Sequence, residues 1–211
     1  MANEDKGFIA LGFMELGARQ VTNSVRPIKT AADLKGLKIR LQPNETHLAT
    51  FRALGANPQA MDIREVYSAM EQKVLDGHEN PYNLIFDSRF FEVQKYVSNT
   101  AHFFDFIAVV ANRKKFQALS PEHQKAIKTA MDKAVATQRV EAAKADAAAL
   151  AELQKKGMQY DAMPTAEREV MRKATAGVVD EVKKRVGADL VDRVLAEVKK
   201  AMQHLFKADI E

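Results

Sequence analysis

One uninterrupted run of helix-forming residues limits the folds open to this chain more than any other feature. Residues 122–156 contain neither Gly nor Pro and are rich in Ala, Lys, Glu and Gln. As a single helix the run would be about 50 Å long at 1.5 Å per residue. Ser120-Pro121-Glu122 supplies an N-cap, a proline at the first helical position and an acidic first turn. The heptad spacing is too poor for a coiled coil, so the rod is predicted to bridge two lobes or to kink.

The residues before this run predict short strands and helices in alternation. Leu37–Leu41 alternates apolar and basic residues, which is the period of a strand with one buried face. A capped helical turn at 30–36 precedes it, and helices are predicted over 44–54 and from Asp62 to a stop at Asp76-Gly77. Strands and helices in such close succession are typical of βαβ units with a largely parallel sheet. The fold class predicted is therefore α/β.

One further strand and two further helices are predicted. Phe103–Ala111 is interrupted only by Asp105, and we expect it to run through the middle of a sheet that is covered on both faces. After the long run, a helix is expected from Thr165 to Val186, and an amphipathic helix from Leu190 to Leu205. The second half of the chain is thus predicted to be almost entirely helical.

Composition excludes several classes of protein. The chain has 211 residues, enough for one generous domain or two small ones. Its net charge is 32 − 28 = +4 with the two signs interspersed, which weighs against a nucleic-acid partner. The absence of Cys removes disulfides, thiolate nucleophiles and cysteine metal sites. No stretch approaches the ~18 apolar residues that a membrane-spanning helix needs.

Signatures of enzymes are almost absent. The sequence contains no phosphate-binding Walker loop, no nucleophile elbow and no His-Glu-x-x-His motif, and its five histidines are scattered. We therefore predict no enzymatic activity, no metal and no cofactor. His78-Glu79 is the one place where a histidine adjoins an acid, and an enzyme acting through this pair is kept as an alternative. A helical scaffold built on the second half, with no ligand cleft, is a further alternative.

An arginine stands where α/β proteins bind their ligands. Arg40 lies near the carboxyl end of the predicted 37–41 strand, on the face opposite its apolar residues. In an open parallel sheet, small molecules bind in the crevice at the carboxyl ends of the strands. A guanidinium there is a two-pronged donor that matches a carboxylate. Spacing alone leaves open the alternative that Arg40 is a solvated or salt-bridged surface residue.

Two polar segments accompany this arginine. Residues 76–81 are predicted to form a turn-like loop in which Asn80 precedes a proline and is therefore extended. Residues 19–24 are predicted to form a polar, strand-like stretch that begins with Arg19. Each segment is compatible with ordinary surface structure and with a binding site.

Together these segments resemble the solute-binding proteins of tripartite ATP-independent periplasmic (TRAP) transporters, the DctP family. The similarity lies in five motifs that occur in the family's order and spacing, from about Gly7 to the C-terminal helices. The motifs are R-x-x-T-N-x-x-R-P-I at 19–28, D-L-K-G-L-K-I-R at 33–40, L-G-A-N-P-x-x-M at 54–61, E-x-Y-x-A-L-Q-Q at 65–72 and D-G-Q-E-N-P at 76–81. The 65–72 segment has Met70 and Glu71 where that motif has Leu and Gln, and His78 replaces the family's glutamine in the last motif, a change that we expect to alter ligand choice or pH response.

The resemblance implies a two-lobed periplasmic receptor that closes on a small organic acid and delivers it to TRAP membrane subunits. It implies a lobe like those of periplasmic binding proteins, with a mixed, mostly parallel sheet, a long inter-lobe helix and C-terminal helices. It also implies that Arg40 clamps the ligand carboxylate, helped from the same lobe by Arg19 and Asn80. The predicted ligand-binding residues are Arg40, Arg19, Asn80, Ile63, Glu65 and Tyr82.

The resemblance also predicts how the chain divides into lobes. Residues 17–105 and 146–211 are expected to form the ligand-binding lobe II, 106–145 a remnant of lobe I, and 1–16 the end of a missing lobe I segment. The family's signal peptide and most of its first lobe have no counterpart here, so we expect Phe106–Ala111 to lack its sheet. An apolar strand of this kind is predicted to drive association of the chain with itself. The alternative function is a truncated receptor that binds no ligand and self-associates.

Overall fold

The protein contains one mixed sheet of six strands. The computed structural model describes residues 6–208, with only the backbone described at 201–208, so predictions that fall on residues 1–5 and 209–211 lie outside it. The strands lie in the order β3-β2-β4-β1-β5-β6. They are β1 (Phe8–Asn23), β2 (Lys38–Leu41), β3 (Asn57–Ala60), β4 (Gly77–Asn80), β5 (Tyr96–Asn112) and β6 (Gln159–Ala162). Only β1 runs antiparallel to its neighbours, so the predicted mixed, mostly parallel α/β sheet is confirmed.

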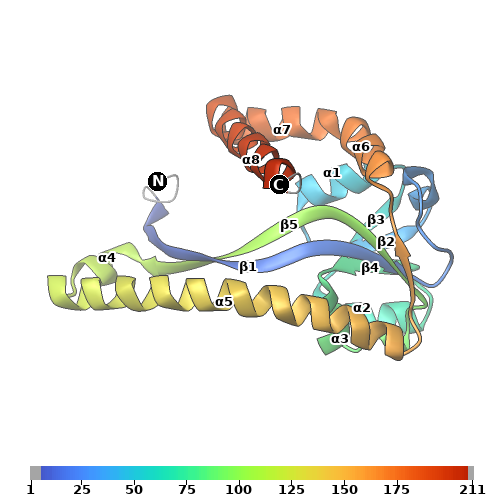
Figure 1. The fold of residues 1–211 in the computed structure, drawn as a ribbon, viewed down its shortest axis with the longest axis horizontal. Helices are drawn as coiled ribbons and strands as arrows, with labels where there is room; N and C mark the ends of the chain where they lie inside the picture. Colours follow the sequence, from blue (N-terminus) through green and yellow to red (C-terminus); the bar gives the residue numbers. More distant parts are fainter. Residues whose placement is uncertain (1–5, 209–211) are drawn as a thin grey trace.

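Helices cover both faces of this sheet (Figure 1). They are α1 (Glu45–Ala53), α2 (Ile63–Glu71), α3 (Tyr82–Asp87), α4 (Arg113–Gln117), α5 (Pro121–Lys155), α6 (Thr165–Ala174), α7 (Ala176–Val186) and α8 (Ala188–Ala208), with short 3-10 turns at Ala31–Leu34 and Phe90–Glu92. One hydrophobic core joins the sheet to α1 and α6 through Phe51 and Met171. A second core joins it to α2, α3 and α5 through Val66, Ile85 and Leu153.

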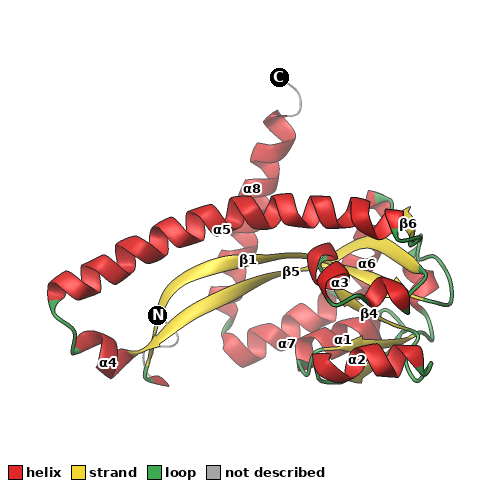
Figure 2. Cartoon of the chain, turned by 90° about the horizontal axis from the view of Figure 1, so that it is seen from below, coloured by secondary structure: helices red, strands yellow, loops and turns green. Residues whose placement is uncertain are grey.

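The long run of helix-forming residues folds as one helix, as predicted. In α5, Ser120 caps the N-terminus by accepting a hydrogen bond from the His123 amide at 3.2 Å. Midway along, the Gln138 side chain donates to the Glu15 carbonyl at 2.7 Å and accepts from the Glu15 amide at 2.9 Å. The helix follows β1 and β5 from their free end to the main sheet (Figure 2). It therefore supports two strands over a region where the rest of the sheet is absent.

The prediction that Phe103–Ala111 lies in a sheet covered on both faces is wrong. This part of β5 pairs only with residues 9–19 of β1, because β4 reaches β1 only at 20–23 and β6 reaches β5 only at 96–99. The result is a two-stranded ribbon, with α5 against one face and with Phe104 and Phe106 49% and 60% exposed. The expectation that Phe106–Ala111 lacks a sheet partner also needs correction, since residues 8–15 supply one.

Three local predictions are corrected by hydrogen bonding. The 76–81 segment is not a turn-like loop, because Gly77–Asn80 forms the buried strand β4 between β2 and β1. Helix α2 ends at Glu71, ahead of the predicted stop, and Lys73 follows with a positive φ of 59°. The helix predicted from Thr165 to Val186 is broken at Thr175, whose hydroxyl donates to the carbonyls of the preceding turn and so competes with helical bonding.

We predict that Gly77→Ala strongly destabilises the fold. A β-carbon at this position would lie 1.9 Å from the Thr22 carbonyl oxygen, so β4 could not stay paired with β1. The expected loss of unfolding free energy in urea is roughly 3 kcal/mol or more, at the upper end of overpacking costs. The matched control is Gly177→Ala in α7, where a β-carbon meets nothing within 4 Å, and there a gain of roughly 0.5–1 kcal/mol is expected. Equal effects at both positions would contradict this role of Gly77.

Candidate ligand-binding site

A buried ion pair joins β1 to β4 next to the carboxyl ends of the parallel strands. Arg19 and Glu79 are only 3% and 0% exposed. Arg19 Nε donates to Glu79 Oε2 at 2.5 Å, and Nη2 donates to Oε1 at 2.7 Å and to the Glu79 carbonyl at 2.8 Å. Arg19 Nη1 donates to Asp105 Oδ2 at 2.9 Å. All three nitrogens of this guanidinium are therefore engaged by acidic residues of the same chain.

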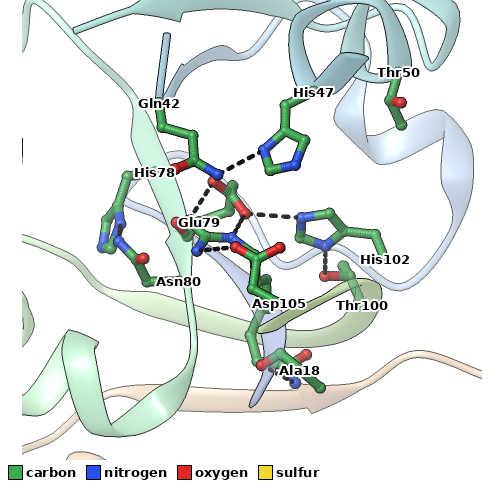
Figure 3. A network of polar contacts seen from close by, with 12 residues as sticks. Ala18, Gln42, His47, Thr50, His78, Glu79, Asn80, Thr100, His102 and Asp105 are labelled. Carbon is green, nitrogen blue, oxygen red and sulfur yellow. Dashed lines mark hydrogen bonds and ion pairs between the residues drawn. The ribbon is translucent and has the colours of Figure 1, made fainter. Parts of the chain in front are cut away.

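The surroundings keep Glu79 ionised. Burial by itself raises the Glu79 pKa, but hydrogen bonds from Arg19 and His102 outweigh it and lower the pKa to about 2. His102 Nε2 lies 3.2 Å from Glu79 Oε2, and its Nδ1 lies 2.7 Å from the Thr100 hydroxyl oxygen (Figure 3). The Arg19 pKa is raised, because attraction to Glu79 and Asp105 exceeds the opposing effect of burial. Arg19 and Glu79 are therefore both charged at neutral pH.

Arg40 differs from Arg19 because no acidic residue neutralises it. It lies on β2, is 4% exposed, and its Nε donates to the Met61 carbonyl at 2.8 Å. Across the described part of the chain, residues 6–208, no ion pair and no further hydrogen bond reaches its Nη groups, and neither is shut off from solvent. Burial lowers the Arg40 pKa, but a guanidinium remains charged in proteins. The alternative of a solvated or salt-bridged surface arginine is therefore wrong.

Asn80 and Tyr82 flank Pro81 at the end of β4, and both are buried. Asn80 Nδ2 lies 3.3 Å from His78 Nδ1. His78 is the residue of β4 that pairs with Arg40 of β2. Burial lowers the His78 pKa to about 3, aided by the charges of Arg40 and Arg19, so this imidazole is neutral. Burial raises the pKa of Tyr82.

Four of the six predicted residues are buried on or beside β1, β2 and β4, and two are exposed. Of the four, Tyr82 packs in the second core with Val66 and Ile85, and no contact within residues 6–208 joins it to Arg40. Ile63 and Glu65 lie in the first turn of α2 and are exposed, with Ile63 43% exposed. Asp62 caps this helix by accepting from the Arg64 amide at 3.0 Å. The same loop supplies the Met61 carbonyl that holds Arg40, so Ile63 and Glu65 lie at the rim of the Arg40 region.

Sequence reasoning missed the acidic partners and a second polar pair. Asp105 was available as a signal, since it is the one acid within the apolar 103–111 strand, whereas Glu79 lies in a segment with the composition of a loop. The contact of both with Arg19 depends on strand pairing. Gln42 and His47 were also missed: Gln42 Nε2 lies 3.1 Å from His47 Nδ1, and the His47 ring stacks on Phe103 at 4.1 Å. Their place in the sequence could have indicated them, because both residues follow the carboxyl end of β2.

The structure offers no support for an enzyme acting through His78 and Glu79. Both side chains are fully buried, and Glu79 is bound by Arg19. Within residues 6–208, no group of three or more His, Asp or Glu side chains could hold a metal ion. None of the described helices has the length and apolar character to cross a membrane. The ordered first half of the chain also removes the alternative of a purely helical scaffold.

The fold and this site are those of an α/β solute-binding protein. The family model described as "Bacterial extracellular solute-binding protein, family 7" matches residues 2–185. The chain belongs to this family, DctP, so the predicted family is confirmed. Because the family is one of solute-binding proteins, the prediction of no enzymatic activity is confirmed too.

Named relatives and solved structures agree with this assignment. The 2,3-diketo-L-gulonate-binding periplasmic protein YiaO of Escherichia coli is 45% identical over 136 residues, 64% of this chain and 42% of that protein. The C4-dicarboxylate-binding periplasmic protein DctP of Vibrio cholerae is 29% identical over 90% of this chain and 57% of its own. The chain thus spans about half the length of these curated relatives.

Two crystal structures illustrate the likeness of fold. A TRAP periplasmic solute-binding protein from Ochrobactrum anthropi matches 96% of this chain and 63% of its own, with a TM-score of 0.88 and 36% identity. The sugar acid binding protein DctPAm from Advenella mimigardefordensis, in complex with galactonate, matches 95% of this chain and 64% of its own, with a TM-score of 0.87 and 34% identity.

We predict that Glu79→Gln weakens the fold and changes its acid response. The substitution leaves Arg19 buried with Asp105 alone, which should cost roughly 3–5 kcal/mol of unfolding free energy at pH 7. In the unaltered protein the stability due to this carboxylate is present above its ordinary pKa of 4.5 and is lost as pH falls toward the folded value of about 2. Urea unfolding from pH 7 to pH 2.5 should show a shallower decline in the variant.

The control for this prediction is Glu45→Gln. Glu45 forms a surface pair with Arg52 at 2.8 Å, so its loss should change stability by less than about 1 kcal/mol. An acid decline of the same slope in Glu79→Gln and the unaltered protein would show that Glu79 is not the titrating group.

Proposed function

We propose that this chain is the ligand-binding part of a TRAP solute-binding protein that holds a small organic acid through Arg40. The observation that carries the proposal is a buried arginine, at the carboxyl edge of a mostly parallel sheet, whose Nη groups have no partner in residues 6–208. A planar guanidinium with two free donors matches a carboxylate bidentately. Asn80 and Tyr82 complete the buried side of the site, and Ile63 and Glu65 form its rim.

Arg19 serves the same site in another way. Four of its five N–H groups donate to Glu79 and Asp105, so it holds Glu79 in place and adds positive charge to the site. Attraction to Glu79 opposes the lowering of the Arg40 pKa by burial, and repulsion from Arg19 adds to that lowering. The arginine pair thus supplies one guanidinium that organises the site and one that binds.

The relatives' names support an organic acid as the ligand class. Their printed ligands are 2,3-diketo-L-gulonate, C4-dicarboxylates and galactonate, all of which carry a carboxylate. By the same reasoning we place the chain in the periplasm, with TRAP membrane subunits as the partners that accept the ligand for transport across the membrane.

We further propose that the chain combines one lobe with a remnant of another. Residues 17–105 and 146–211 form lobe II, and 106–145 with 1–16 belong to lobe I. In support, the β1–β5 ribbon leaves the sheet together with the N-terminal half of α5 (Figure 2). The apolar side chains on this ribbon, Phe8, Phe13, Phe104, Phe106, Ile107 and Val110, are 45–60% exposed. An exposed apolar surface of this kind is typical of a face that another layer of protein covers.

A second candidate follows from that same surface. If this chain acts without a covering lobe, it self-associates through the ribbon and binds no ligand. The two edges and one face of the ribbon would then meet a second copy.

We predict self-association that depends on the ribbon. Sedimentation velocity at tens of micromolar should show species larger than 23.5 kDa. The double substitution Phe104→Ser with Phe106→Ser should return the chain to a monomer, because it removes two exposed rings from the same strand of the ribbon. The control is Val140→Ser on α5, an exposed apolar residue away from the ribbon strands. A monomer in the unaltered chain would contradict association.

We predict that carboxylate binding depends on Arg40. Arg40→Ala should weaken binding of an organic acid by roughly 2–5 kcal/mol, because a buried charge partner is removed. Arg40→Lys should not restore it, since an ammonium cannot make the two-pronged contact. Titration followed by heteronuclear NMR measures this even at millimolar affinity. Arg52→Ala, on the exposed side of α1, is the control. Unchanged binding in Arg40→Ala would exclude Arg40 as the anchor.

A further inference from the structure

His78 is a fully buried polar side chain on the same face of the sheet as Arg40. The two residues pair directly between β4 and β2, so their side chains project to the same side, and Asn80 follows two residues along β4. His78, Asn80 and Arg40 are 0%, 4% and 4% exposed. Figure 3 shows His78 and Asn80 together on one side of β4, with Glu79 on the other.

One hydrogen bond joins His78 to Asn80. Asn80 Nδ2 lies 3.3 Å from His78 Nδ1. An amide nitrogen can only donate, so Nδ1 accepts and the ring proton is on Nε2. Burial lowers the His78 pKa to about 3; attraction to Glu79 opposes this, and the positive charges of Arg40 and Arg19 reinforce it. The imidazole is therefore neutral at neutral pH, and Nδ1 keeps the lone pair that accepts from Asn80.

The hydrophobic core gains little from this imidazole. Its Nε2 is buried and has no hydrogen-bond partner within residues 6–208, and the ring packs edge-on against Phe90 at 4.3 Å. A buried polar atom without a partner costs stability, whereas an apolar side chain of similar size would carry no such cost. A polar group at a position where an apolar one would pack as well points to a role outside the core.

Asn80 keeps hydrogen-bonding capacity that the fold does not use. Its side chain makes no hydrogen bond within residues 6–208 other than the one to His78, and its Oδ1 is not shut off from solvent. Oδ1 and the second N–H of Nδ2 are thus available to a ligand. Without the contact to His78 Nδ1, the amide would be free to turn over and exchange its donor for its acceptor. The imidazole therefore fixes which end of the amide stands where.

We propose that His78 is a positioning residue that holds the Asn80 amide in the orientation that receives the ligand. The inference rests on the proposed function, in which Arg40 binds a carboxylate and Asn80 completes the buried side of the site. His78 is fully buried and does not touch the ligand, so it acts through Asn80 alone. An amide that is already fixed loses less conformational freedom when the ligand binds, and this raises affinity without adding a contact.

A double-mutant cycle on ligand affinity tests whether His78 acts through Asn80. The probes are galactonate and succinate, each titrated into the ¹⁵N-labelled chain and followed by NMR. His78→Leu fills a similar space without an acceptor and should raise the Kd about fivefold, the equivalent of one neutral hydrogen bond. Asn80→Ala should raise it by as much or more. The double variant should bind no more weakly than Asn80→Ala alone, because His78 then has no amide to position.

A conservative variant and a surface control separate positioning from a general effect on the fold. His78→Gln supplies an amide oxygen that accepts from Asn80 Nδ2, so it should restore most of the affinity. His78→Leu should keep the Tm of the unaltered protein, since it removes a buried nitrogen that has no partner. His123→Leu, at an exposed position on α5, is the matched control and should change neither affinity nor Tm.

Nitrogen NMR of the histidine rings tests the geometry in the absence of ligand. His78 should be the neutral tautomer with its proton on Nε2, and it should stay so from pH 8 to about pH 5, above its folded pKa of about 3. A His78 ring that carries its proton on Nδ1 would overturn the inference, because Nδ1 would then donate to Asn80 and the amide would be reversed.

The outcomes separate this inference from the proposed function. Four results would overturn the positioning role while Arg40→Ala still weakens binding: additive effects of His78→Leu and Asn80→Ala, unchanged affinity in His78→Leu, no recovery in His78→Gln, or a loss of affinity that follows a lowered Tm. Binding that Arg40→Ala leaves unchanged would overturn the carboxylate anchor itself. A chain that binds neither acid would overturn the proposed function and this inference with it.

Discussion

The site depends on one buried ion pair, between Arg19 and Glu79. Both side chains are withdrawn from water, and Arg19 satisfies Glu79 with two side-chain hydrogen bonds while Asp105 takes its remaining nitrogen. A buried pair of this kind is costly to break because either partner alone would be an uncompensated charge. Glu79 is therefore neutralised by Arg19, and within residues 6–208 no ion pair joins it to Arg40. What remains is a second arginine that is buried, positively charged and open at its Nη groups.

The backbone geometry that creates this pair also isolates the ribbon. Strand β4 can lie against β1 only because Gly77 has no β-carbon, and this pairing places Glu79 opposite Val21 and beside Arg19. Only four of the 16 residues of β1 pair with β4, so the other twelve continue beyond the main sheet with β5 as their one strand partner in the described chain. Helix α5 then supports this ribbon through Gln138 and the packing around Gly12. The short strand β4 thus accounts both for the Arg19–Glu79 pair and for the exposed apolar surface of the ribbon.

Most of the fold was predictable from the sequence, because capping, alternation and the uninterrupted 122–156 run are local signals. Strand β2, helix α1 and helix α5 appear where those signals place them. Strand β4 was not predictable in this way, since Gly-His-Glu-Asn has the composition of a loop and becomes a strand through pairing on both sides. The exposure of Phe104 and Phe106 was missed because an apolar run carries no information about what covers it. Arg40 was found from its place on β2. The Glu79 and Asp105 partners of Arg19 were not, because these contacts join residues 60 and 86 positions apart in the chain.

The most direct test of this account is a crystal structure of the chain with a bound carboxylate. The account predicts that the carboxylate accepts hydrogen bonds from the Nη groups of Arg40, while Arg19 keeps its bonds to Glu79 and Asp105. A carboxylate that displaces Glu79 from Arg19, or that lies away from Arg40 altogether, would contradict the division of roles between the two arginines.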